Sequence, residues 1–192
     1  MSEVKRQLPP PIEMTMPLVQ VLGRRRSSRE FAVQDVDASL LSAVLWACAG
    51  QTLPDGHRTV PSALDSREVL AYVFDRLGVW RYDAGDNTLV EMARGDKRAA
   101  TTEIQPFVEK APVTIVFIAD KNRADSRMKG EALKTMMAVD AGCMVQAAQM
   151  ACTAMGLASV PRASFDPAKI RKAARLNDDH VPLMAVTIGF GE

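Results

Sequence analysis

The sequence contains few of the residues that disulfides, metal sites and nucleophilic catalysis need. Among its 192 residues only three are cysteines and two are histidines. Cys48, Cys143 and Cys152 lie in apolar stretches without CxxC spacing, which is typical of reduced thiols in a core. His57 and His180 have no second metal-ligating residue at the usual spacing. We therefore expect no disulfide framework, no metal centre and no cysteine nucleophile.

Long apolar runs and an excess of one charge are absent as well. No segment approaches the roughly 18 consecutive apolar residues of a membrane-spanning helix. The opening MSEVKRQLPPP has no apolar run of the kind found in a signal peptide. Lysine and arginine total 24 against 23 acidic residues, whereas nucleic-acid-binding domains usually carry a clear basic excess. These features predict a cytoplasmic protein that binds neither membranes nor nucleic acid.

Several familiar enzyme signatures are also missing. The sequence has no GxGxxG after a strand, no P-loop and no GxSxG nucleophile motif. An enzyme without evident acids, bases or nucleophiles often leaves its chemistry to a bound cofactor. The length and a hydrophobic content of 47% suit one domain with a sizeable core.

The residue pattern predicts one α+β domain over residues 16–192, preceded by a polar, proline-rich arm over residues 1–15. One helix is expected to start after the capping residue Asp37 and to end at Gly50. Residues 113–119 (VTIVFIA) are expected to form a strand that is buried on both faces. The other expected elements are a helix beginning near Pro17, a loop at 51–66, strands at 68–74, 79–82, 88–92 and 182–188, and helices at 130–155 and 168–176.

The longest expected helix, over residues 130–155, is apolar on most of its sides. Its first apolar stripe contains Met136, Val139, Cys143, Ala147, Met150 and Ala154, and its second contains Met137, Met144, Ala148 and Ala151. A helix of this kind must lie in the centre of a fold or at an interface.

A basic cluster follows the first helix directly. Arg25, Arg26, Ser27, Ser28 and Arg29 crowd guanidinium groups, hydroxyls and free backbone N–H groups into five positions. Such a set can enclose a phosphate, because arginine forks match phosphate oxygens and bring compensating charge. Taken alone, the pattern favours a simpler interpretation, a solvated basic cap at a helix C-terminus.

Two loops are further candidates for a ligand edge. Residues 58–63 (RTVPSA) combine hydroxyls with a turn-setting proline in a long loop, although an ordinary surface loop has the same composition. Residues 160–166 (VPRASFD) contain small residues that would let backbone N–H groups approach a ligand. Asp166 followed by Pro167 is also the expected start of a helix.

Taken in order, these segments resemble the nitroreductase superfamily, and in particular its small SagB-like branch. RRRSSREF resembles the Arg-Arg-Ser-x-Arg-x-Phe/Tyr motif of the family, and LLSAVLWACAG resembles the LLWAxxG helix of the branch. RTVPSALDSREV resembles Arg-Thr-x-Pro-Ser-Ala-x-Asn-x-Gln-Glu-Val, and QPFVEKAPVTIVFIAD resembles a Gln-x-Phe-Val-x-x-Ala-Pro strand. The long helix and the loop after it, DAGCMVQAAQMACTAMGLASVPRASFD, are similar as well. Each piece is weakly specific, but their shared order from about Met16 to Gly191 is strong evidence.

The resemblance implies a central, mostly antiparallel sheet surrounded by helices, in an intertwined homodimer with FMN at the subunit interface. By motif, the phosphate and ribityl chain would be bound by Arg25, Arg26, Ser27 and Arg29. The flavin edge would be lined by the partner chain's loop, that is by Pro61, Ser62 and Ala63. The isoalloxazine would be flanked by Pro161, Arg162, Ala163 and Ser164, with Gln105 near its pyrimidine end.

The sequence departs from the family pattern at four places, one of which is Ala147 in the long helix, where a common Gln-Asn pair has Asn. Asp65 stands where the family usually has Asn, and Arg67 where it usually has Gln. An aspartate cannot donate the amide hydrogen bond, so Asp65 either contacts the cofactor in another way or pairs with Arg67 or Arg58. Many relatives carry a later basic residue at the phosphate site, for which Arg24 and Arg162 are the candidate replacements.

The implied activity is a ping-pong transfer of hydride from NAD(P)H through flavin N5 to a small-molecule acceptor such as a nitroaromatic or a quinone. Three alternatives remain. A SagB-like flavin dehydrogenase would oxidise azolines in modified peptides, a non-catalytic protein would bind flavin without being reduced by NAD(P)H, and a scaffold dimer would bind only an anion.

Overall fold

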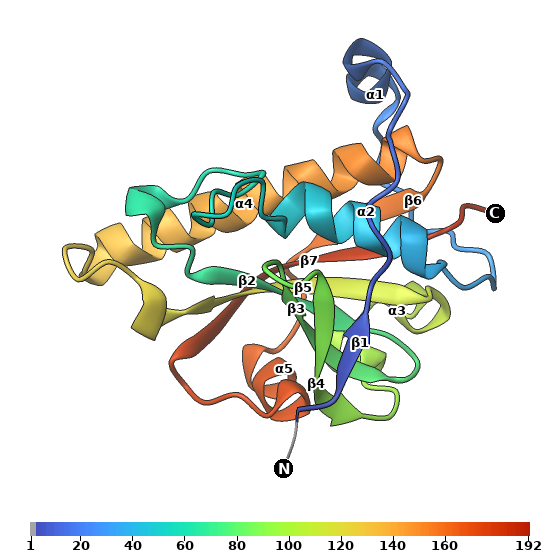
Figure 1. The fold of residues 1–192 in the computed structure, drawn as a ribbon. Coiled ribbons are helices and arrows are strands. Elements are labelled where there is room, and N and C mark those ends of the chain that lie inside the picture. The colour runs from blue at the N-terminus through green and yellow to red at the C-terminus, as the bar shows by residue number, and fades with distance from the viewer. Residues whose placement is uncertain (1–2) are drawn as a thin grey trace.

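The computed structural model describes residues 3–192 as one seven-stranded sheet with helices on both faces (Figure 1). The strand order is β1-β4-β3-β2-β5-β7-β6, and every neighbouring pair runs antiparallel. The predicted α+β class with an antiparallel sheet is therefore confirmed. The strands are β1 (Lys5–Gln7), β2 (Val69–Phe74), β3 (Gly78–Asp83), β4 (Thr88–Arg94), β5 (Val113–Asp120), β6 (Ala158–Arg162) and β7 (His180–Gly189).

The helices lie close to the positions expected from the sequence. Five are α-helices: α1 (Leu18–Arg24), α2 (Ala38–Ala49), α3 (Phe107–Lys110), α4 (Gly130–Ala154) and α5 (Pro167–Ala174). Three short 3-10 turns connect other elements: η1 (Ala63–Asp65), η2 (Arg98–Thr101) and η3 (Lys121–Arg123). None of the helices in residues 3–192 is long and apolar enough to cross a membrane.

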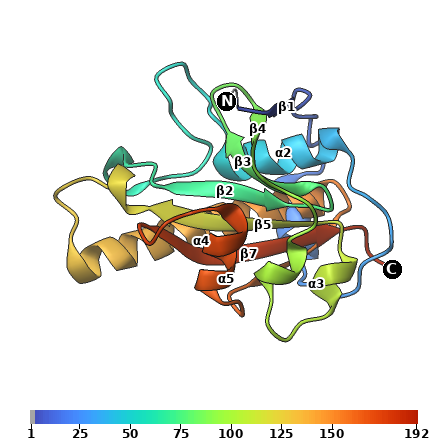
Figure 2. The ribbon, with the colours of Figure 1, turned by 90° about the horizontal axis from the view of Figure 1, so that it is seen from below.

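The two faces of the sheet are covered differently. Helices α2 and α4 pack together on one face, and α5 covers the other (Figures 1 and 2). Successive side chains of β5 point to opposite faces of the sheet, so this strand contributes to the cores on both faces. Ile115 and Phe117 point into the larger core under α2 and α4, whereas Val116 and Ile118 point into the smaller core under α5. This is why the run VTIVFIA has no charged position and its one polar residue, Thr114, is buried, as predicted for a strand buried on both faces.

Local sequence signals account for the ends of the main helices. Asp37 caps α2, because its Oδ1 accepts hydrogen bonds from the N–H groups of Ser39 (2.8 Å) and Leu40 (2.9 Å). Asp166 caps α5 in the same way through Ala168 N–H at 2.8 Å, with Pro167 in the first turn. Gly156, with φ +74°, follows the end of α4.

The N-terminal arm packs against the sheet. The sequence predicts an extended arm, and in the structure Lys5–Gln7 pair with β4 and form the edge strand β1. Leu8, only 2% exposed, then anchors the arm in the larger core. Strand β6 extends to Arg162, so three residues of the candidate loop at 160–166, namely Val160, Pro161 and Arg162, belong to it.

Helix α1 projects away from the sheet beside the C-terminal part of α4 (Figure 1). Of its residues, only Val21 is buried. Leu18, Val19 and Leu22 are 60%, 77% and 53% exposed. Exposed apolar side chains that lie together are typical of interaction surfaces.

Candidate functional site

The structure brings together the basic cluster, Gln105 and the loop at residues 161–164. Ser28 N–H donates to the carbonyl oxygen of Ser159 at 3.0 Å, which holds the basic cluster alongside β6. Gln105 accepts a hydrogen bond from Ser164 Oγ at 2.9 Å. Segments from three distant parts of the chain therefore meet at one end of the molecule.

The arginines of the basic cluster are used in two different ways. Arg26 Nη1 donates to the carbonyl oxygens of Gly23 (2.9 Å) and Arg25 (2.8 Å), so this side chain caps the end of α1. The guanidinium groups of Arg25 and Arg29 make no hydrogen bond or ion pair with any residue of the described chain, 3–192. The cap interpretation thus holds for Arg26, while two neighbouring cations remain available for an anion.

Arg162 is a buried structural cation and does not fit the suggested role of a replacement phosphate ligand. The residue is 4% exposed. Its Nε donates to Thr187 Oγ1 at 3.0 Å, and its Nη1 donates to the carbonyl oxygen of Thr101 at 2.8 Å. Burial lowers the pKa of its guanidinium to about 10. The sequence pattern predicts Arg162 in a ligand loop, but its position on β6 turns the side chain into the protein.

Arg162 and Ser164 together orient the amide of Gln105. Arg162 Nη1 and Ser164 Oγ donate to the Gln105 oxygen Oε1 at 3.4 Å and 2.9 Å, respectively. Within residues 3–192, the Gln105 Nε2 group and the N–H groups of Ala163 and Ser164 have no hydrogen-bond partner. This end of the molecule therefore presents several free donors in addition to two free cations.

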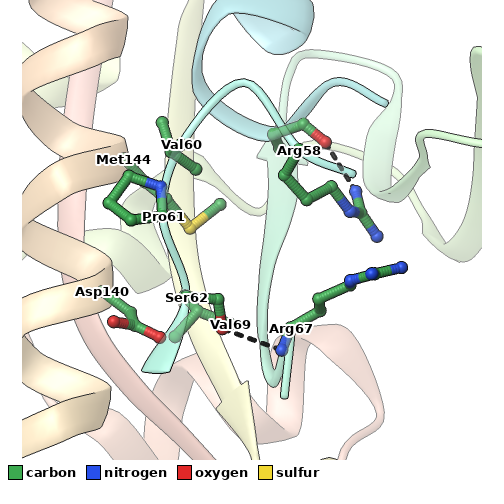
Figure 3. A pocket seen from close by; sticks show the side chains of 9 residues that line it. Arg58, Val60, Pro61, Ser62, Arg67, Val69, Asp140 and Met144 are labelled. Carbon is green, nitrogen blue, oxygen red and sulfur yellow. Dashed lines mark hydrogen bonds between the residues drawn. The ribbon is translucent and has the colours of Figure 1, made fainter. Parts of the chain in front are cut away.

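The loop with Pro61, Ser62 and Ala63 lies elsewhere, against the middle of α4. Ala63 N–H donates to Asp140 Oδ2 at 2.8 Å, and Ser62 Oγ donates to Glu68 Oε2 at 3.3 Å. Figure 3 shows this loop beside Asp140 and Met144. The cavity among these residues has a volume of only about 20 Å³, which is room for about one water molecule.

The residues after Ala63 adopt an uncommon backbone conformation. Leu64, Asp65 and Arg67 have φ values of 52°, 54° and 53°. A left-handed conformation costs a residue with a side chain roughly 1–2 kcal/mol, and such residues concentrate at binding and catalytic sites. The strain is held by local contacts, including the hydrogen bond from Arg67 N–H to Ser62 Oγ at 2.8 Å.

Asp65 pairs with Arg67, as one of the two interpretations of the sequence expected. Arg67 Nε donates to Asp65 Oδ1 at 2.7 Å, and a second hydrogen bond joins Arg67 Nη2 to Asp65 Oδ2. The hydrogen bonds to Arg67 lower the pKa of the Asp65 carboxyl. Arg58 instead donates to the carbonyl oxygen of Ala49 at 2.6 Å and so stabilises the end of α2 (Figure 3).

Two buried carboxyl groups support this loop, and the sequence interpretation missed both. Glu68 is fully buried and Asp140 is 5% exposed. Burial raises the pKa of the Glu68 carboxyl, and the charge of Asp140 raises it further. A lone aspartate inside an otherwise apolar stretch of α4 was the available signal for Asp140.

The cysteine thiols are unsuited to nucleophilic catalysis. Cys48 and Cys152 are completely buried and Cys143 is partly buried. Burial raises the pKa of the Cys48 thiol, and it raises that of Cys152 to about 12. A thiol with so high a pKa is not a nucleophile at neutral pH.

One chain does not bring all of the predicted residues together. The Pro61 loop contacts Asp140, whereas β6 starts after the end of α4. The helix rises about 20 Å between Asp140 and Ala154. The loop and the basic cluster therefore lie near opposite ends of the second half of α4 (Figure 1).

The donors at the β6 end match the chemical groups of FMN. Two unpaired guanidinium groups suit its phosphate, and the free N–H groups of Ala163, Ser164 and Gln105 suit the oxygens and ring nitrogens of an isoalloxazine. These donors at the β6 end provide no flat surface against the far edge of the ring. The motif assigns that surface to the strained loop with Pro61, Ser62 and Ala63, which lies too far away in the same chain.

Comparisons with known proteins were made for the whole chain. A family model described as "Nitroreductase family" matches residues 22–190. A curated protein of Methanocaldococcus jannaschii, assigned to the nitroreductases, is 28% identical over 181 residues, covering 90% of each chain. The crystal structure of a protein of Ralstonia eutropha with the same assignment is similar at a TM-score of 0.91 and 33% identity, covering 98% of this chain and 90% of that one. The Escherichia coli microcin synthetase McbBCD complex contains a chain of similar fold, with a TM-score of 0.79 and 15% identity over 88% of this chain and 70% of that one.

Proposed function

Because the chain belongs to the nitroreductase family, we propose that it is an FMN-dependent enzyme that transfers hydride from NADH or NADPH to a small organic acceptor by a ping-pong mechanism. The family supports an oxidoreductase, and its members generally depend on FMN. The observation that carries the proposal is the set of free donors around β6. The basic cluster with Arg25 and Arg29 is bonded to β6 through Ser28 and Ser159, and Gln105 is bonded to Ser164 just after this strand. Nitroaromatic compounds and quinones are the proposed acceptors.

FMN, when bound, supplies a ring nitrogen that accepts hydride and passes it on. The protein would position the flavin and surround it with charged and hydrogen-bonding groups. Arg25 and Arg29 would hold the phosphate, with Ser27 and the backbone around Arg26 completing the cradle. The N–H groups of Ala163 and Ser164 and the amide of Gln105 would stabilise negative charge that develops on the ring. Arg162 would act indirectly, because it holds the amide of Gln105 and the start of the loop after β6 in place.

We further propose that a second copy of the chain completes the site. Family members are usually dimers. The first apolar stripe of α4 faces outward, with Met136 37% exposed and Val139 52% exposed, whereas Met137 and Met144 of the second stripe are buried. An apolar groove of about 500 Å³ lies between α1, α2 and α4. A partner covering this surface would bring its own Pro61, Ser62, Ala63 and Asp65 to the far edge of the ring.

The absorbance spectrum of the purified protein is the first test. The visible band of oxidised flavin is expected, and anaerobic addition of NADH or NADPH should bleach it. Nitrofurazone or menadione should restore it and should support steady NAD(P)H oxidation. Bound FMN that neither nucleotide reduces would contradict the proposed activity, and a colourless protein that does not bind added FMN would contradict the cofactor as well.

The same spectra separate the alternatives. A flavin that NAD(P)H leaves oxidised, but that is reduced by an azoline-containing peptide, would indicate peptide dehydrogenation, the reaction implied by the SagB-like resemblance. A flavin that no donor reduces would indicate a binding protein without catalysis. We rank the reductase first because the matching family model and the Methanocaldococcus and Ralstonia relatives named above are described as nitroreductases.

A further inference from the structure

A basic groove lies on the face of the sheet opposite α2 and α4. It has a volume of about 600 Å³ and is bounded by the end of β4, by η2 and by α5. Figure 2 shows α5 on this face of the molecule. Its lining consists of cationic residues and alanines, namely Arg94, Lys97, Lys169, Lys172 and Arg175 together with Ala93, Ala99, Ala100 and Ala173.

Most of these charges are not compensated. Arg94 pairs with Glu91 at 2.9 Å, and the adjacent Arg98 pairs with Asp96 at 2.6 Å. Within the described part of the chain, no ion pair or side-chain hydrogen bond involves Lys97, Lys169, Lys172 or Arg175. No acidic residue lines the groove, although the chain as a whole has almost equal numbers of acidic and basic residues.

On α5, the positive charges without a partner lie on the side that faces the groove. Arg171, on the other side of the helix, pairs with Asp178 at 3.3 Å. Lys169 and Lys172 are three positions apart on the groove side, where like charges repel across one helical turn. Within residues 3–192 the fold thus holds four uncompensated cations around one concavity, an arrangement that an anionic ligand would stabilise.

The lining also restricts the kind of anion. It offers no side-chain acceptor, no hydroxyl and no aromatic ring, so it cannot pair with or stack on a nucleobase. Both edges of β4 are already paired, with β1 and with β3, so a peptide cannot add to it as a further strand. Lysine ammonium groups act as compact point charges that suit phosphate. The volume is within the range of small-molecule sites, about 300–1,000 Å³.

We propose that this groove binds a small ligand carrying two or more linked phosphate groups. The phosphates would lie between Lys97, just before η2, and the side chains of Lys169, Lys172 and Arg175, above a floor of alanines. The site is separate from the basic cluster at residues 25–29, and its existence does not depend on the proposed reductase activity.

Titration calorimetry with sodium tripolyphosphate tests the proposal. The full-length protein is used with FMN in excess, so that any flavin-phosphate site is filled, at low ionic strength to limit screening. The double variant Lys169→Ala/Lys172→Ala should bind tripolyphosphate about 100-fold more weakly than the unaltered protein, because each ammonium–phosphate interaction that is removed accounts for about tenfold in affinity. Alanine favours helix, so α5 should remain folded, which a circular dichroism melting curve verifies.

The matched control is Lys129→Ala/Lys134→Ala, which removes the same charge at the start of α4 on the other face of the sheet. It should bind tripolyphosphate like the unaltered protein, and both double variants should retain their flavin content. Equal affinity in the groove variant and the control would overturn the proposal, because the ligand would then bind elsewhere. Absence of tripolyphosphate binding, or binding only of a hexaglutamate peptide or a short DNA duplex, would overturn it as well.

Discussion

Arg25 and Arg26 are adjacent in the sequence, yet their guanidinium groups have different surroundings. Arg26 is bonded to two carbonyl oxygens at the end of α1, whereas Arg25 has no partner in residues 3–192. The direction of each side chain depends on where α1 ends. A motif of consecutive arginines therefore need not contribute all of its charges to the same ligand.

Arg25→Ala should weaken FMN binding, because a charge-assisted contact to phosphate contributes about 1.5–3 kcal/mol, or roughly 10- to 100-fold in the dissociation constant. Fluorescence titration of the apoprotein with FMN measures the change. Lys134→Ala, which removes an exposed charge near the start of α4, is the control and should have a smaller effect. Unchanged FMN affinity in Arg25→Ala would remove this residue from the proposed phosphate site.

Glu68→Gln should stabilise the protein in a pH-dependent way. The pKa of Glu68 is raised in the folded protein above its ordinary value of 4.5. The stability contributed by the protonated form is fully present below the unfolded pKa and is lost as the pH rises through the folded pKa. Glutamine stays neutral, so the variant should gain on the order of 1 kcal/mol at pH 8, roughly 2–4 °C in Tm, and little at pH 4.

Thermal melts of both proteins between pH 4 and pH 8 measure this difference. Glu103→Gln, at an exposed position, should show no comparable trend with pH. A Glu68→Gln variant whose advantage is constant or decreases with pH would contradict the raised pKa.

At the scale of elements, α4 shows how one helix can serve two surfaces. Its second apolar stripe is buried in the larger core, and its first stripe is exposed or only partly buried. Asp140, between the two, bonds to Ala63 N–H and positions the strained loop. The helix thus supports the sheet, offers an interface and holds one half of the proposed site.

Asp37→Ala should destabilise the fold by about 1 kcal/mol, because two N–H groups at the start of α2 lose their acceptor. The expected decrease in Tm is roughly 2–4 °C. Asp35→Ala, which breaks only the exposed ion pair with Arg76, should change Tm less. An equal effect of the two variants in thermal melts would show that the cap contributes nothing specific.

At the scale of the whole molecule, the candidate site is divided between two distant positions. The basic cluster, Gln105 and the loop after β6 meet at one end of the fold, while the Pro61 loop lies along α4 at Asp140. An exposed apolar surface on α1 and α4 connects these positions. Dimerisation through this surface would explain both the division of the site and the exposure of the apolar side chains.

Val139→Glu should therefore weaken both self-association and FMN binding, because it places a charge in the proposed interface. Sedimentation velocity over a dilution series, with flavin absorbance recorded in parallel, measures the two properties together. Ala138→Glu introduces the same charge at the neighbouring, also exposed position on a different side of α4, and should have little effect. A Val139→Glu protein that remains dimeric and fully loaded with FMN would contradict this interface.

The sequence by itself determined the order and type of most elements and the family, because caps, periodicity and motifs are local signals. The extents of α2, β5 and α4, and the caps Asp37 and Asp166, followed from residues close to one another in the chain. Only the tertiary structure decided that Arg162 is buried against Thr101 and Thr187, that Asp140 holds Ala63, and that four cations without a partner in residues 3–192 surround one groove. These features depend on contacts between residues far apart in the chain, and no local pattern specifies which distant partner a side chain will meet.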